Sequence, residues 1–188
     1  MIYLASTSPR RKAILKSSGI PFRAVKPDYK EGKSAGNLSP STVVKTHALA
    51  KAMSVAKKVR RGVVIGADTV VYFRGKIIGK PKHLKEAAGV LGALAGRWHS
   101  VYTGVALLKI SAGTVRKKIV FYEKTRVHLK PMDRKALGGY FKKIRPLDKA
   151  GAYAIQSKRA GIVREIRGSY SNAVGLPVEK LCDRLKKL

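Results

Sequence analysis

The amino-acid sequence predicts an α/β protein built on a mixed β-sheet. Helix-like and strand-like segments alternate along the 188 residues, and no linker separates them. Two long strand-like segments, 101–110 and 115–129, flank the turn Ser111-Ala112-Gly113 and predict a hairpin. Because 45% of the residues are hydrophobic, the chain can bury one sizeable core. We therefore expect a single domain over residues 1–188.

Five segments carry the start and stop signals of helices. Gly19 stops the first, Pro40 opens the second and Gly96 stops the third. The expected helices span residues 10–18, 39–59, 82–94, 133–144 and 177–188. Beside the hairpin, apolar runs in the gaps predict strands over residues 2–5, 22–25, 63–71, 152–155 and 162–166.

The loop after the first strand is suited to binding polyphosphate. Ser8 is placed to cap the next helix and Pro9 to occupy its first turn, so the N-terminal amides of the helix point at the loop. Arg10 and Arg11 add planar donors that match phosphate oxygens. The alternative is an ordinary capped helix with solvated arginines, and the segment alone does not decide between the two.

One carboxylate interrupts an apolar, strand-like run. Asp68 follows Val63-Val64-Ile65-Gly66-Ala67, and a carboxylate in such a setting needs a partner. We expect it to act as a base or as a ligand of a divalent cation, the alternative being a carboxylate that ends a strand by accepting from turn amides. Lys51, in the second helix, and Lys80, beside Pro81, are each either a phosphate-binding cation or a solvated charge.

Several short blocks occur in an order that is typical of one family. They are Ser6-Thr7-Ser8-Pro9-Arg10-Arg11, Glu31, Ala48-Leu49-Ala50-Lys51-Ala52, Gly66-Ala67-Asp68-Thr69, Gly79-Lys80-Pro81, Tyr102-Thr103-Gly104-Val105-Ala106-Leu107, residues 147–156, Gly168-Ser169-Tyr170 and Val174-Gly175-Leu176-Pro177. With these blocks the chain resembles the Maf proteins, cytoplasmic nucleoside triphosphate pyrophosphatases, over essentially its whole length. The resemblance implies an elongated mixed sheet flanked by helices, two lobes with a nucleotide cleft between them, a cytoplasmic location and often a homodimer.

The resemblance also implies a reaction. Water attacks between the α and β phosphates of a nucleoside triphosphate and releases the nucleoside monophosphate and pyrophosphate. In the family pattern, Asp68 accepts a proton and holds a divalent metal, Mg²⁺ or Mn²⁺, together with Glu31. The other matching positions bind the triphosphate, with cations at Arg10, Arg11, Lys51 and Lys80 and hydroxyls at Ser6 and Ser8.

Three positions resemble the members of the family that prefer dTTP and UTP, namely Arg10, Thr69 and Gln156. A glutamine amide both donates and accepts, so Gln156 can pair with the carbonyl and imide edge that uracil and thymine share. Ala154 and Ser157 stand where the family often has glycine. A preference for modified or other nucleotides, such as 7-methyl-GTP or CTP, therefore stays open.

The formal net charge of +31 is not explained by this family. Basic clusters such as 57–61 and 116–118 are spread along the chain, and such a surface attracts polyanions and favours nonspecific binding of nucleic acid. It also opposes self-association, which weakens the expectation of a homodimer. The alternative function is a nucleic-acid-binding protein on an inactive Maf scaffold. The retained catalytic-type residues and the lack of an aromatic-rich recognition motif argue against it.

No targeting or membrane signal is evident in the sequence. No apolar run approaches the roughly 20 residues that a membrane-spanning helix needs, so we expect no membrane partner and a cytoplasmic protein. Cys182 is the single cysteine, which excludes a disulfide within the chain.

Overall fold

The computed structural model describes residues 1–30, 38–156 and 161–188. The chain forms two compact units. Unit 1 consists of Met1–Asp68, Thr103–Glu123 and Gly175–Leu188, and unit 2 consists of Thr69–Tyr102 and Lys124–Val174. The expectation of a single domain over residues 1–188 stays a prediction.

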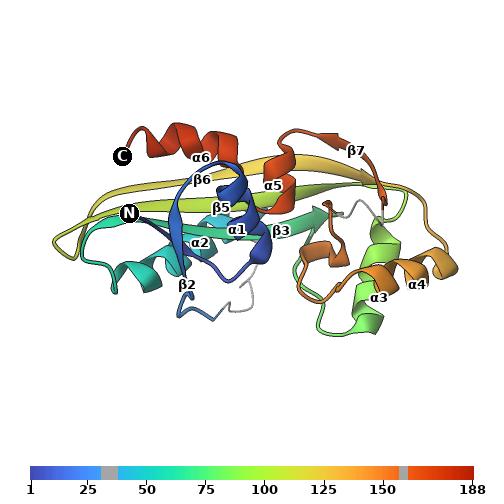
Figure 1. The fold of residues 1–188 in the computed structure, drawn as a ribbon. Helices are drawn as coiled ribbons and strands as arrows, with labels where there is room; N and C mark the ends of the chain where they lie inside the picture. Colours follow the sequence, from blue (N-terminus) through green and yellow to red (C-terminus); the bar gives the residue numbers. More distant parts are fainter. Residues whose placement is uncertain (31–37, 157–160) are drawn as a thin grey trace. The chain divides into compact units, whose positions relative to one another are not determined.

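Seven strands form one mixed sheet in the order β2-β1-β3-β5-β6-β7, and β4 pairs with β3 (Figure 1). The strands are β1 (Ile2–Ala5), β2 (Phe22–Val25), β3 (Gly62–Phe73), β4 (Lys76–Ile78), β5 (Trp98–Ser111), β6 (Thr114–Leu129) and β7 (Val163–Arg167). The pairs β1–β2 and β1–β3 are parallel, whereas β3–β4 and β6–β7 are antiparallel. The predicted hairpin is confirmed as β5 and β6, and Ala112 and Gly113 turn it with positive φ.

Helices flank this sheet, as the family resemblance implies. They are α1 (Pro9–Ser17), α2 (Pro40–Ala56), α3 (Leu84–Leu94), α4 (Arg134–Lys143), α5 (Tyr170–Val174) and α6 (Val178–Leu185). The predicted second helix ends three residues late, because the amides of Lys58 and Val59 donate to the carbonyls of Val55 and Ala56 in a tighter turn. The prediction of a mixed α/β sheet with flanking helices is confirmed.

In unit 1, helix α2 packs directly on the sheet backbone. A Cβ atom at Gly66 on β3 would lie 2.2 Å from the Ala48 carbonyl oxygen, and one at Gly104 on β5 would lie 2.3 Å from the Val44 carbonyl oxygen. Only glycine permits an approach this close. Ala52, on the same helix, belongs to the buried hydrophobic cluster of unit 1. The two glycines therefore let α2 lie close to both β3 and β5.

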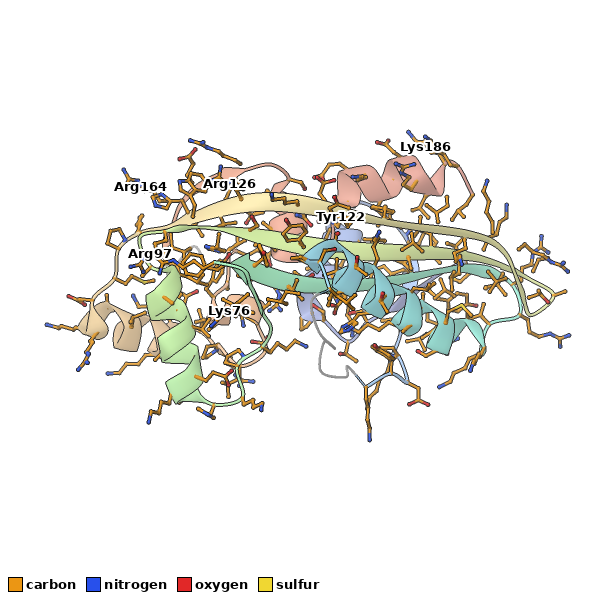
Figure 2. The ribbon with its side chains drawn as sticks, turned by 180° about the vertical axis from the view of Figure 1, so that it is seen from behind. Lys76, Arg97, Tyr122, Arg126, Arg164 and Lys186 are labelled. Carbon is orange, nitrogen blue, oxygen red and sulfur yellow. The ribbon has the colours of Figure 1, made fainter. Side chains whose placement is uncertain are left out.

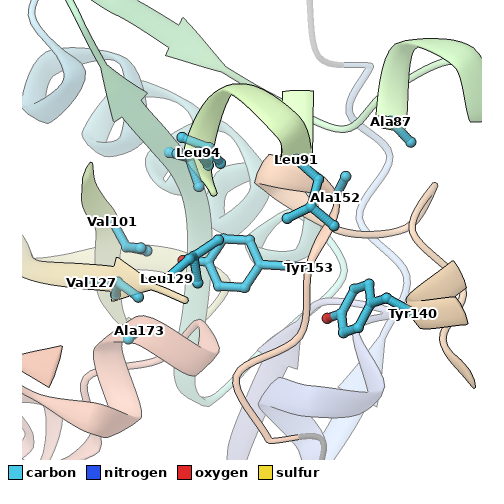
Figure 3. Packing of buried hydrophobic residues seen from close by; sticks show 11 residues of the cluster. Ala87, Leu91, Leu94, Val101, Val127, Leu129, Tyr140, Ala152, Tyr153 and Ala173 are labelled. Atoms are coloured by element: carbon cyan, nitrogen blue, oxygen red, sulfur yellow. The ribbon is translucent and has the colours of Figure 1, made fainter. Parts of the chain in front are cut away.

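Unit 2 has its own hydrophobic core (Figure 3). Leu91 and Leu94 of α3 are fully buried in it, together with Leu129 of β6. Tyr153 is also buried there, and Figure 3 shows its ring beside Leu129. The Tyr153 hydroxyl lies 2.6 Å from Nε2 of the buried His99, so the polar end of the ring has a partner inside the core.

The strand expected over residues 152–155 is wrong. A short 3₁₀ turn, η1, spans Ala150–Ala152 instead. Gly151 and Ala152 both have positive φ, 71° and 61°, which ends any extended run. The Ala154 amide donates to the Tyr140 hydroxyl at 2.9 Å rather than to a neighbouring strand.

Two short elements were not expected from the sequence. Strand β4 has three residues and helix α5 has five, too few for a hydrophobic period to appear. Among the described residues, no helix combines the length and the apolar character that crossing a membrane requires.

Candidate active site

The centre of the candidate site is a buried ion pair in unit 1. Asp68 lies within β3, only 5% exposed, and Lys51 lies on α2, 8% exposed. The Lys51 Nζ donates to the Asp68 Oδ1 at 2.6 Å. The prediction that this carboxylate has a partner is confirmed. Because β3 continues to Phe73, Asp68 does not end the strand, and because Lys51 is buried, it is not a solvated surface charge.

His47 stands one turn before Lys51 on the same helix and is a member of the site that the sequence reasoning missed. Its Nδ1 lies 3.5 Å from the second carboxylate oxygen, Asp68 Oδ2. The ring also packs edge-on against Tyr29, with centroids 5.9 Å apart. Residues four apart share a helix face, so the spacing of His47 and Lys51 was the available signal.

The surroundings keep Asp68 ionised at neutral pH. Burial alone would raise the pKa of this carboxyl, but the nearby His47 ring and the positive charges of Lys51 and Arg11 outweigh it, so the pKa lies below its ordinary value. A carboxylate with a lowered pKa stays anionic at neutral pH, so it can accept hydrogen bonds and bind a cation, but it is a weak base. The site therefore favours orienting a water molecule or holding a cation over storing a proton.

The first loop supplies a fixed guanidinium beside this pair. The Ser6 Oγ, in a residue only 5% exposed, accepts from the Ser8 amide at 3.1 Å and from the Arg11 Nη1 at 3.3 Å. Arg11 also donates from Nε to the Gly175 carbonyl at 2.9 Å. Arg11 is thus oriented on two sides, unlike a solvated arginine on an ordinary capped helix. Its charge acts on Asp68, which links the loop to the ion pair.

The helix that follows the loop begins as predicted. Ser8 occupies the N-cap position of α1 and Pro9 its first turn. Within the described part of the chain, the Ser8 side chain makes no capping hydrogen bond, so its hydroxyl does not cover the first amides of the helix. Arg10, half-buried, follows on the same helix turn as Arg11. The expectation that Ser8 caps α1 through its side chain is therefore wrong, and phosphate binding by this loop stays a prediction.

Three further predicted residues belong to unit 2. Thr69 follows Asp68 on β3 and is half-buried, whereas Lys80 and Gln156 are exposed. The Gly79 carbonyl accepts from the Gly151 amide at 3.2 Å, so the segment that carries Lys80 is joined to the turn that precedes Gln156. Glu31, the second predicted carboxylate, lies outside the described residues.

The described residues of the site fit Mg²⁺ or Mn²⁺ only if the metal takes most of its ligands from substrate phosphates and water. Among residues 1–30, 38–156 and 161–188, no three His, Cys, Asp or Glu side chains are grouped so that they could hold a metal ion. Asp68 offers one ionised carboxylate. Mg²⁺ commonly takes one or two protein carboxylates and completes its shell with substrate phosphates and water, and a site of this kind agrees with the residues present.

The parallel strand β1 leads into a helix N-terminus with two arginines, next to a buried lysine–carboxylate pair, an arrangement typical of α/β proteins that bind polyphosphates. The family described as Maf-like protein matches residues 1–188. The chain belongs to the Maf family.

Similar proteins cover nearly the whole chain. A protein of Pelotomaculum thermopropionicum named dTTP/UTP pyrophosphatase is 43% identical over 186 residues, which are 99% of this chain and 95% of the relative. One of Dictyoglomus thermophilum with the same name is 41% identical over 187 residues, 100% of this chain and 95% of the relative. Among solved structures, the Ham1 protein of Staphylococcus aureus aligns with a TM-score of 0.51 at 14% identity, covering 99% of this chain and 98% of that one. That likeness concerns the fold.

Proposed function

We propose that this chain is a nucleoside triphosphate pyrophosphatase that hydrolyses dTTP and UTP to the nucleoside monophosphate and pyrophosphate. The observation that carries the proposal is the buried Lys51–Asp68 pair, with Arg11 oriented beside it, in a chain 41–43% identical to proteins named dTTP/UTP pyrophosphatase. Hydrolysis of the α–β phosphoanhydride needs cations that bind the phosphates and a hydrogen-bond acceptor that orients the attacking water. Unit 1 supplies both.

Each residue of the site has a separate task in this reaction. Asp68, ionised at neutral pH, accepts a hydrogen bond from the attacking water and orients it. Arg10 and Arg11 bind phosphate oxygens through their planar forks, and Lys51 adds a point charge that Asp68 holds in place. As the α–β bridging bond breaks, these cations stabilise the charge that gathers on the leaving pyrophosphate.

The remaining predicted groups extend this assignment. Mg²⁺ or Mn²⁺, held by Asp68 and Glu31, would neutralise phosphate charge and polarise the reacting phosphoryl group. Lys80 would bind the far end of the triphosphate, while Ser6 and Ser8 would donate hydrogen bonds to it. Thr69 and Gln156 would face the base, with the Gln156 amide pairing with the edge common to uracil and thymine.

A substrate panel tests the proposal. Release of pyrophosphate is measured from dTTP, UTP, CTP, dATP, GTP and 7-methyl-GTP, with Mg²⁺ and with Mn²⁺, at moderate salt. We expect dTTP and UTP to be turned over fastest. Gln156→Ala should reduce the preference for UTP over CTP by up to about tenfold, because the variant lacks the amide that pairs with the uracil edge. A preference for 7-methyl-GTP or CTP in the unaltered chain would overturn the substrate assignment.

A further inference from the structure

Unit 2 carries a second basic feature, on the outward face of strands β5, β6 and β7. Trp98 and Tyr102 of β5 are half-buried, whereas the alternating His99 and Val101 are buried. On β6, Arg126 is exposed and the next residue, Val127, is buried. Because strand side chains alternate between faces, the two sets mark an outward face and a core face.

Cations and rings alternate on this outward face, and the cations lie on the rings. The guanidinium carbons of Arg126 and Arg167 lie 4.8 Å and 4.7 Å from the centroid of the Trp98 ring. The His128 ring stacks on the same tryptophan, with centroids 5.0 Å apart and planes inclined by 12°. Figure 2 labels Arg126 on β6. We call Trp98, Arg126, His128 and Arg167 the Trp98 cluster.

A second contact of this kind continues the face along the sheet. The Lys124 Nζ lies 5.7 Å from the centroid of the Tyr102 ring, and Tyr72 of β3 packs edge-on against Tyr102 with centroids 6.2 Å apart. Lys124 and Arg126 are two residues apart on β6, which places their side chains about 7 Å apart along the strand. The face thus presents a row of cations with aromatic rings between them.

The arrangement has an electrostatic cost that an anion would relieve. Arg126 and Arg167 are direct cross-strand partners in the β6–β7 ladder, and like charges directly opposite each other destabilise a sheet. Glu165 accepts from the Arg167 Nε at 2.6 Å, which offsets part of this charge. Among the described residues named for this face, Glu165 is the only acidic one, within a chain of net charge +31.

We propose that this face binds single-stranded nucleic acid. Guanidiniums held on a tryptophan present their donors to phosphate oxygens with little loss of side-chain entropy on binding. Guanidinium planes and tyrosine rings stack unpaired bases, which a duplex does not expose. The charge of the face complements a phosphodiester backbone, and its rings distinguish it from the basic clusters at 57–61 and 116–118, which contain no aromatic residue. This inference is independent of the proposed enzymatic activity.

The single tryptophan of the chain makes the proposal directly measurable. The full chain is titrated with a 5′-hydroxyl oligouridylate or oligothymidylate of about 20 nucleotides, a length above the usual site size. Binding is followed by the anisotropy of a labelled strand and by selectively excited Trp98 fluorescence. The probe strand has no triphosphate, so it is not a substrate of the proposed reaction. We expect both signals to change with one affinity.

Matched charge reversals locate the site. Arg126→Glu and Lys124→Glu on the face should each weaken binding about tenfold or more, and the salt slope should fall by about 0.7 for each phosphate that the variant no longer neutralises. Lys118→Glu, an exposed residue of the same strand, changes the net charge equally and should weaken binding less than about threefold. Pyrophosphate release from UTP should be unchanged in all three.

Four outcomes would overturn the proposal. Equal loss of binding in Lys118→Glu would show that only net charge matters, and binding without a change in Trp98 fluorescence would place the strand elsewhere. Equal affinity for a duplex of the same length would exclude base stacking. Equal quenching by polyglutamate would make the face a general binder of acidic polymers, acidic proteins included.

Discussion

The Lys51 Nζ and the Asp68 Oδ1 lie 2.6 Å apart at the contact between helix α2 and strand β3, and both residues are nearly inaccessible to solvent. Neither charge would be buried without the other, since an unpaired buried charge is far more costly than a paired one. The pair therefore ties the helix to the strand and also sets the charge state of the proposed catalytic carboxylate.

Lys51→Met should destabilise the protein by about 3–5 kcal/mol, because it removes the ammonium that pairs with buried Asp68 and leaves only His47 and Arg11 near that charge. The free energy of unfolding is measured by urea denaturation. The double variant Lys51→Met/Asp68→Asn should recover at least half of that loss, since it removes the uncompensated carboxylate charge. It should remain inactive, because catalysis requires that carboxylate. Full activity in Lys51→Met would contradict the role assigned to Lys51.

Gly104→Ala should destabilise unit 1 by about 1–3 kcal/mol and reduce turnover of UTP. The added Cβ would lie 2.3 Å from the Val44 carbonyl oxygen, so α2 must shift, and with it Lys51. Gly89→Ala is the control, because its Cβ would meet nothing within 4 Å and alanine favours the helix. We expect Gly89→Ala to be neutral or slightly stabilising in thermal unfolding; equal losses in the two variants would count against the packing argument.

Arg11→Lys should lower kcat/KM for UTP by about tenfold or more, although it keeps the charge. The lysine cannot reproduce the Nε bond to the Gly175 carbonyl together with the Nη1 bond to Ser6, so the cation loses its orientation. Lys12→Ala on the exposed side of the same helix removes a full charge and should change kcat/KM less than about twofold. The reverse order of effects would show that the loop acts only through its net charge.

Stability should depend on pH through His99. Burial lowers the pKa of His99 to about 4, so the folded protein keeps this ring neutral while the unfolded chain takes up a proton below about pH 6.5. In that window the unfolded state binds more protons, so the free energy of unfolding falls as the pH falls. The loss should reach about 3 kcal/mol between pH 6.5 and pH 4. Urea denaturation of His99→Gln should show a flatter profile over this range.

Much of the fold could be predicted because its elements are long or clearly bounded. Strand β2 begins and ends where expected. The hairpin of β5 and β6 follows from two strand-like segments on either side of one turn. The turn at Gly151 and Ala152 could not be predicted, because its conformation depends on the burial of Tyr153 and on the bond between the Ala154 amide and the Tyr140 hydroxyl. Tertiary contacts of this kind leave no local pattern.

The candidate site could be predicted only in part for a similar reason. The isolated carboxylate in an apolar strand indicated that Asp68 needs a partner, but the register between α2 and β3 decides which helix residues reach it. That register depends on the close approach at Gly66, so the spacing of His47 and Lys51 indicates only that they share a helix face, and not that this face meets Asp68. The other members of the Trp98 cluster lie 28 to 69 positions after Trp98 in the sequence and meet it only through strand pairing.

The products formed from UTP test the central claim most directly. We expect the unaltered chain with Mg²⁺ or Mn²⁺ to yield UMP and pyrophosphate, without UDP, and Asp68→Asn to be slower by about 10²-fold or more. Formation of UDP and phosphate, or equal rates in the two proteins, would contradict the assignment of this site to cleavage between the α and β phosphates.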